Sequence, residues 1–132
     1  MLESKVITCS VRRGAQELYE MLWKPESFLL WASGLSNAGL EKDAQGWKAQ
    51  GPEGLIRIRF SDYNDLGVMD HWVDVGAGRV VYVPLRIVAN EEGSEVMLTL
   101  FRQPQMSAEK FAEDAAWVRK DLASLKALAE GG

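Results

Sequence analysis

The last quarter of the chain carries the clearest hydrophobic pattern. Between Ser107 and Glu130, apolar residues recur at spacings of four and three, which keeps them on one stripe of a helix with a period of 3.6 residues. Ser107 precedes the stripe in the position of an N-cap. The pattern predicts one long amphipathic helix that packs through Phe111, Ala115, Val118, Leu122, Leu125 and Ala129.

The rest of the chain favours strands joined by tight turns. Lys5–Val11 alternates apolar and polar residues as a half-buried strand does. Helical spacing follows over Gly14–Leu22 and again over Pro25–Gly34. Turn residues, such as those of Gly51–Gly54, separate the remaining segments. We therefore predict six further strands, a β-α-α-β6-α order and a single domain over 1–132, with strands near 36–42, 46–51, 54–61, 67–75, 79–89 and 94–102.

Alternation within the strands predicts which side chains face the helix. Ile56, Ile58 and Phe60 alternate with arginines, so the even positions of this strand should point inward. A four-residue loop over Asp62–Asp65 would place residue 58 opposite 69 and residue 56 opposite 71, with Arg57 opposite Asp70. His71 then points inward as the one ionisable group in an apolar wall. The wall continues through Met69, Val73, Val75, Val81, Val83, Leu85, Ile87, Val96, Leu98 and Leu100.

The outward face carries Trp72, Tyr82 and Phe101 in one row across neighbouring strands. An exposed aromatic row indicates a self-association surface, as in a homodimer, or a second partner site. A one-residue bulge would instead turn the three rings into the interior, and the pattern leaves both arrangements open. Arg86 shares this face, where it either binds a ligand carboxylate or pairs with an acid.

Composition excludes several classes of function. A net charge of -4 disfavours a nucleic-acid partner, which usually requires a basic face. Cys9 is the single cysteine, so no disulfide framework is expected, and the N-terminus lacks a signal-like or membrane-spanning segment. We therefore expect a cytoplasmic protein. Asp70, His71 and Asp74 cannot bind one metal ion together, because alternation turns His71 away from both carboxylates, and we expect no metal and no cofactor.

Several segments resemble the START-like, or SRPBCC, superfamily, which includes polyketide cyclases and lipid-transfer domains. They are Leu22–Phe28 with Trp31, Phe60–Val73, Tyr82–Arg86, Gly93–Val96 and Thr99–Arg102, and they are similar to those of small bacterial members. The resemblance covers essentially the whole chain. It implies an α+β helix-grip fold, in which a curved antiparallel sheet of seven strands grips the C-terminal helix around an apolar cavity. The resemblance indicates little about activity, because this scaffold hosts carriers, sensors and enzymes.

The expected function is binding of a small hydrophobic or amphipathic molecule in that cavity. One alternative is an enzyme of the polyketide cyclase or dehydrase type with His71 as general acid/base, although a neutral, hydrogen-bonded histidine is the plainer interpretation. A second alternative is a protein-interaction module that uses the outward face. The candidate ligand-binding residues are Phe28, Trp31, Trp47, His71, Val83, Leu85, Leu98 and Trp117, and the candidates for either ligand or interface are Trp72, Tyr82, Arg86 and Phe101.

Overall fold

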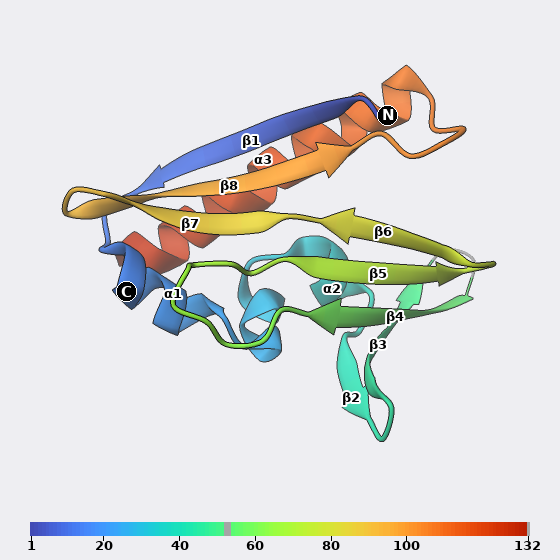
Figure 1. Ribbon diagram of the computed structural model, residues 1–132, viewed down its shortest axis with the longest axis horizontal. Helices are drawn as coiled ribbons and strands as arrows, with labels where there is room; N and C mark the ends of the chain where they lie inside the picture. Colours follow the sequence, from blue (N-terminus) through green and yellow to red (C-terminus); the bar gives the residue numbers. More distant parts are fainter. Residues whose placement is uncertain (52–53, 132) are drawn as a thin grey trace.

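The computed structural model describes residues 1–51 and 54–131, and within them the chain forms eight strands and four helical segments (Figure 1). In chain order these are β1 (Ser4–Val11), α1 (Ala15–Leu22), the 3-10 helix η1 (Pro25–Leu30), α2 (Ser33–Asn37), β2 (Glu41–Asp43), β3 (Gly46–Gly51), β4 (Gly54–Phe60), β5 (His71–Gly76), β6 (Arg79–Val83), β7 (Leu85–Asn90), β8 (Gly93–Phe101) and α3 (Ala108–Gly131).

The strands form two antiparallel sheets, with orders β1-β8-β7 and β2-β3-β4-β5-β6. Figure 1 shows that they meet where β6 leads into β7, so together they form one curved surface. The predicted α+β class and closing helix are confirmed. The predicted single sheet of seven strands is wrong in detail, because eight strands form two sheets, and three short helical segments stand where two were predicted. Pro84 divides the predicted strand over 79–89, because proline cannot donate a ladder hydrogen bond. The strand predicted from residue 36 begins only at Glu41, after the helix α2.

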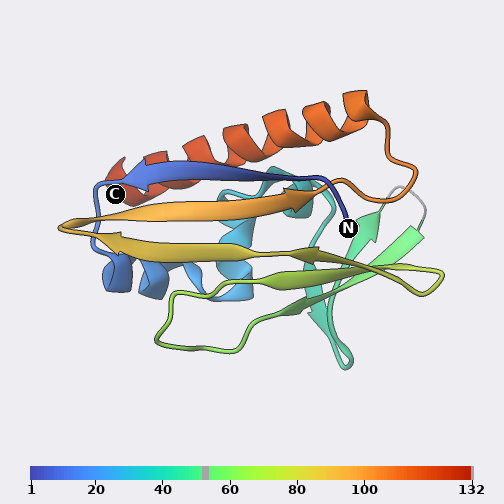
Figure 2. The same cartoon turned by 45° about the horizontal axis from the view of Figure 1, so that its top comes forward.

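The helix α3 begins as the sequence predicts. The Ser107 hydroxyl accepts a hydrogen bond from the backbone N–H of Lys110 at 3.0 Å, which is the expected N-cap geometry. The helix packs along β1 and also contacts β8 (Figure 2). Its buried residues are Phe111, Ala115, Leu122, Leu125 and Ala129, while Val118 is half-buried.

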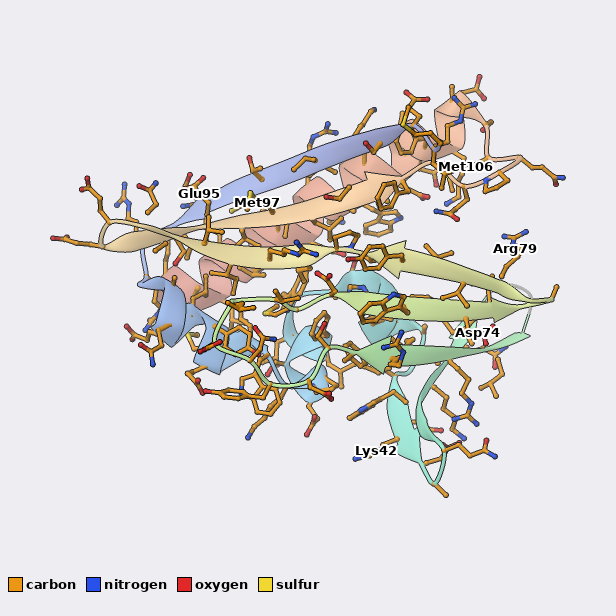
Figure 3. All side chains as sticks on the ribbon, viewed as in Figure 1. Lys42, Asp74, Arg79, Glu95, Met97 and Met106 are labelled. Atoms are coloured by element: carbon orange, nitrogen blue, oxygen red, sulfur yellow. The ribbon has the colours of Figure 1, made fainter. Side chains whose placement is uncertain are left out.

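Alternation along the strands separates an inner face, toward α3, from an outer face. On β8, Val96 and Leu98 are buried, whereas Glu95 and Met97 lie on the outer face (Figure 3). The β4–β5 pairing joins residue 60 to 71 and residue 58 to 73, so the predicted register is wrong by four residues. Four is an even number, so His71 still points inward.

The register differs because the connection between β4 and β5 spans residues 61–70 and crosses to the other sheet. The Met69 backbone N–H donates to the Leu85 carbonyl at 2.7 Å, and the Ile87 N–H donates to the Gly67 carbonyl at 2.9 Å. The predicted Arg57–Asp70 pair is therefore absent among the described residues, and Arg57 lies opposite Asp74. The turn predicted over 51–54 lies partly outside the described residues.

The core has two clusters of buried apolar residues. The larger lies between the three-stranded sheet, α1 and α3, and contains Leu18, Leu22, Phe28, Leu85, Leu122 and Leu125 among others. The smaller is formed by Leu40, Ala49 and Ile58. Leu35 and Phe60 pack against both clusters. Of the helices in the described chain, none combines the length and apolar character that crossing a bilayer requires.

Candidate ligand-binding site

An apolar cavity of about 640 Å³ opens between the short helices, the sheets and α3. Five of the predicted ligand-binding residues line it, namely Phe28, Trp31, His71, Val83 and Leu98. These five residues share one apolar wall, and their role in ligand binding stays a prediction. The remaining wall is formed by Ala32, Gly34, Leu35, Asn37, Ala38, Gln50, Gly51, Ile56, Leu100, Val118 and Asp121.

The other three predicted ligand-binding residues lie elsewhere. Leu85 is fully buried in the larger core cluster. Trp47 packs against the smaller cluster and lines a separate groove. Trp117 is 43% exposed and does not line the cavity, because the next residue of the helix, Val118, faces the cavity instead. The Lys120 ammonium lies 4.9 Å from the centroid of the Trp117 ring.

Sequence reasoning missed part of the cavity wall. Ile56, Leu100 and Val118 are predicted on the inward apolar faces, but they are not among the predicted ligand-binding residues. Leu35 and Ala38 were missed because the sequence around them was interpreted as a strand beginning at 36, whereas Leu35 lies on α2.

His71 is a titratable group of the wall and is 8% exposed. Its ring lies 5.4 Å from the Phe28 ring and 5.9 Å from the Phe60 ring, measured between centroids. Burial lowers the pKa of the imidazole to about 4, and the Met69 backbone and the Asp70 charge oppose this effect without cancelling it. His71 is therefore neutral at neutral pH.

Two buried nitrogen atoms in this wall have no hydrogen-bond partner within the described part of the chain. They are Nδ1 of His71 and Nε1 of Trp31. An unpaired buried polar group costs about 1–3 kcal/mol, so most such groups in proteins are paired. Polar hydrogen-bonding capacity therefore remains unused in two rings of the cavity wall.

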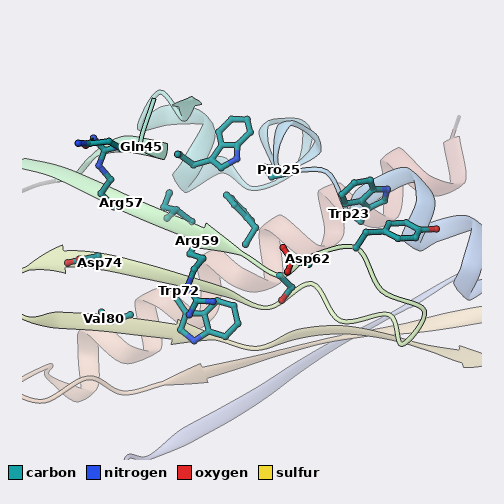
Figure 4. A pocket seen from close by; sticks show the side chains of 15 residues that line it. Trp23, Pro25, Gln45, Arg57, Arg59, Asp62, Trp72, Asp74 and Val80 are labelled. Carbon is teal, nitrogen blue, oxygen red and sulfur yellow. The ribbon is translucent and has the colours of Figure 1, made fainter. Parts of the chain in front are cut away.

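The outer face carries the predicted aromatic row, defined here as Trp72, Tyr82 and Phe101. The Trp72 and Tyr82 rings stack with centroids 5.3 Å apart, and those of Tyr82 and Phe101 are 6.3 Å apart. The Arg59 guanidinium lies 4.0 Å from the Trp72 ring centroid (Figure 4). The register irregularity falls between Asp74 and Gly76, beyond Trp72, so it does not turn the row into the cavity. Trp72 lines an outer groove of about 760 Å³.

Arg86 pairs with Asp70, which is the second of the two roles that the sequence leaves open for it. Its guanidinium donates to Asp70 Oδ2 at 2.9 Å, the Tyr82 hydroxyl donates to the same oxygen at 2.6 Å, and the Leu85 N–H donates to Oδ1 at 2.9 Å. Burial acts to raise the pKa of Asp70, but the bonds from Arg86, Tyr82 and Leu85 together lower it. The cluster joins the start of β5 to β6 and β7.

Comparison with known proteins supports the fold. No protein-family model matches the sequence, and no match is found among curated proteins. Solved structures do match. An uncharacterised protein from Bacillus thuringiensis aligns over 96% of this chain and 98% of its own, with 12% identity and a TM-score of 0.73. The Aha1 dimer from Colwellia psychrerythraea aligns over 98% and 97%, with 12% identity and a TM-score of 0.68.

Ara h 8.0201 aligns over 98% of both chains, with 9% identity and a TM-score of 0.65. Identities this low establish the fold and not the activity. Aha1 and Ara h 8.0201 are of the Bet v1-like, SRPBCC type. With the long C-terminal helix held against a curved antiparallel surface, the chain has the helix-grip fold of these proteins.

Proposed function

We propose that the protein binds a small hydrophobic or amphipathic molecule in the cavity between the short helices, the sheets and α3. The observation that carries the proposal is the cavity of about 640 Å³, whose wall is mainly apolar. Protein interiors are normally close-packed, and small-molecule sites typically measure about 300–1,000 Å³. Each methylene group that a ligand buries there contributes about 0.8 kcal/mol.

The unpaired nitrogen atoms of His71 and Trp31 support an amphipathic ligand over a purely apolar one. Both rings belong to the cavity wall, and both nitrogen atoms are covered by neighbouring protein atoms. A polar group of a ligand would reach either nitrogen once the ring turns to expose it. Pairing would then recover part of the desolvation cost of these groups.

Filling the cavity tests the proposal. Val83 lies in the wall, opposite His71 on the neighbouring strand, so Val83→Trp should occupy the space that a ligand needs. Val6→Trp is the matched control, because Val6 is 59% exposed on β1. We expect the wild type and Val6→Trp to bind a fluorescent hydrophobic dye and to retain a co-purifying molecule in native mass spectrometry. Equal dye binding by a folded Val83→Trp variant would contradict the proposal.

Catalysis of the polyketide cyclase or dehydrase type is a second candidate, favoured by the neutral imidazole of His71 within the cavity wall. A neutral imidazole can accept a proton from a carbon next to a carbonyl group. Its lowered pKa of about 4 makes it a weak base, however, which disfavours this role. The role requires that His71→Leu abolish turnover of a polycarbonyl substrate while its binding persists; turnover that survives the substitution excludes it.

Self-association through the outer aromatic row is a third candidate. The stacked rings of Trp72, Tyr82 and Phe101, with the Arg59 guanidinium over the Trp72 ring, form a half-exposed cluster of the residue types that are enriched in protein interfaces. This candidate predicts a concentration-dependent dimer that Trp72→Ser dissociates. A monomer at high concentration in sedimentation equilibrium excludes it.

A further inference from the structure

We propose that the cavity selects ligands whose polar end is neutral or cationic, and that Asp121 excludes ligands that carry a carboxylate or phosphate group. This ligand class rests on the proposed function, because it concerns the same cavity.

The first argument is the charge of the cavity wall. Among its described residues, Asp121 is the one with a formal charge at neutral pH, and neither lysine nor arginine is present. His71 contributes no positive charge at neutral pH, because burial lowers its pKa to about 4. An anionic group that binds in this solvent-open pocket therefore loses part of its hydration without meeting a cation. Burying an unpaired charge costs several kcal/mol even after the protein relaxes.

The second argument is the geometry of Asp121 itself. It lies on α3 three residues after Val118, and both residues contribute to the wall. The Ser33 hydroxyl donates to Oδ1 of Asp121 at 2.6 Å, which connects α2 to α3 and orients the carboxylate. Among the described residues, Oδ2 receives no hydrogen bond and no basic group lies within 4.0 Å. This oxygen can accept a hydrogen bond from a ligand hydroxyl or ammonium group.

The other aspartates that are at least partly buried among the described residues each pair with a basic residue, which distinguishes Asp121 from them. Asp70 binds Arg86, Asp114 binds Lys110, and Asp43 binds Arg57 through two hydrogen bonds of 2.8 and 2.9 Å.

Of the four basic residues of α3, Lys110 pairs with Asp114, and Arg119 makes no ion pair with Asp121 among the described residues. Lys120 lies over the exposed Trp117 ring, and Lys126 donates to the Ser10 carbonyl and to Glu130. The negative charge of Asp121 is thus not compensated by these neighbours on its own helix.

Three ligands with the same ten-carbon apolar tail test the inference: decanol, decylamine and undecanoate, titrated into the full chain at neutral pH by calorimetry. We expect undecanoate to bind at least about tenfold more weakly than decanol, and decylamine to bind at least as tightly as decanol. In Asp121→Asn the undecanoate-to-decanol ratio of affinities should rise toward one, and the advantage of decylamine should disappear. Asp114→Asn is the matched control, because Asp114 lies on the same helix, pairs with Lys110 and is not part of the wall.

The outcomes separate this inference from the proposed function. Equal affinity of the wild type for undecanoate and decanol would overturn the charge selectivity and leave the cavity as a binding site. Unchanged selectivity in a folded Asp121→Asn variant would overturn the role of Asp121. If none of the three ligands binds, the proposed function fails together with the selectivity.

Discussion

The free energy of unfolding should fall between about pH 7 and about pH 5, and His71 should account for the fall. His71 is the single histidine of the sequence, so no other imidazole titrates in this range. Its pKa is 6.5 in the unfolded chain and about 4 in the folded protein, because burial disfavours the charged ring. Between these values the unfolded chain binds a proton that the folded protein does not, so stability decreases as the pH falls.

The magnitude follows from the two pKa values. One pKa unit corresponds to about 1.4 kcal/mol, so the difference between 6.5 and about 4 is worth about 3 kcal/mol over the full window. About 2 kcal/mol of this should be lost between about pH 7 and about pH 5. Asp70 does not contribute to this loss. Its pKa lies below the ordinary carboxyl value of 3.8, so its contribution disappears only at lower pH.

Urea unfolding of the wild type and of His71→Leu across this pH range measures the effect. Leucine keeps an apolar side chain in the wall and removes both the titration and the unpaired Nδ1 atom, so the variant should show little pH dependence. The imidazole proton resonance of His71 should also titrate near pH 4 in the folded protein. Equal pH dependence in wild type and variant, or an imidazole that titrates near pH 6.5, would refute the reasoning.

Two substitutions outside the cavity, together with one control substitution, test the packing that supports it. Gly67→Ala places a methyl group 2.2 Å from the Ile87 carbonyl oxygen at a φ of 72°, and it should cost about 3 kcal/mol or more in urea unfolding. Gly39→Ala has nearly the same φ of 71° in open space and should cost only about 1–2 kcal/mol, so equal losses would contradict the predicted clash. Asp70→Asn should lower the free energy of unfolding by about 1–2 kcal/mol at neutral pH; the loss is modest because Arg86 is half exposed. Because the pKa of Asp70 is lowered, the difference in stability between the wild type and this variant should shrink as the pH falls below the ordinary carboxyl range. A difference that stays constant with pH would contradict this prediction.

Periodicity explains why much of the cavity wall could be predicted. The stripe of α3 and the alternation of β4 and β8 depend only on local spacing, and they place Val118, Ile56 and Leu98 in the wall. His71 was placed inward through a register that was wrong by four residues. Because side chains alternate with a period of two, an even error preserves the face and changes only the partner across the strands.

The parts that could not be predicted depend on contacts between distant segments. The 61–70 connection leaves β4 to pair with β7, and no local pattern distinguishes it from a short hairpin turn. The same holds for α2, which occupies five residues within a sequence that also fits a strand. Trp117 was predicted to lie near the cavity because it borders the apolar stripe, but one residue along a helix turns a side chain by about 100°.

The cavity exists because small residues stand where two core clusters meet. Leu35 and Phe60 join the clusters, and the adjoining wall includes Ala32, Gly34 and Ala38, none of which is large enough to fill the space. The main cluster shares Phe28, Trp31 and Leu98 with this wall, but it also joins α3 to β1 through residues that do not line the cavity, namely Ile7, Val11, Leu122 and Leu125. Close packing on one side and small side chains on the other therefore let the same sheet serve as a stable support and as a binding surface.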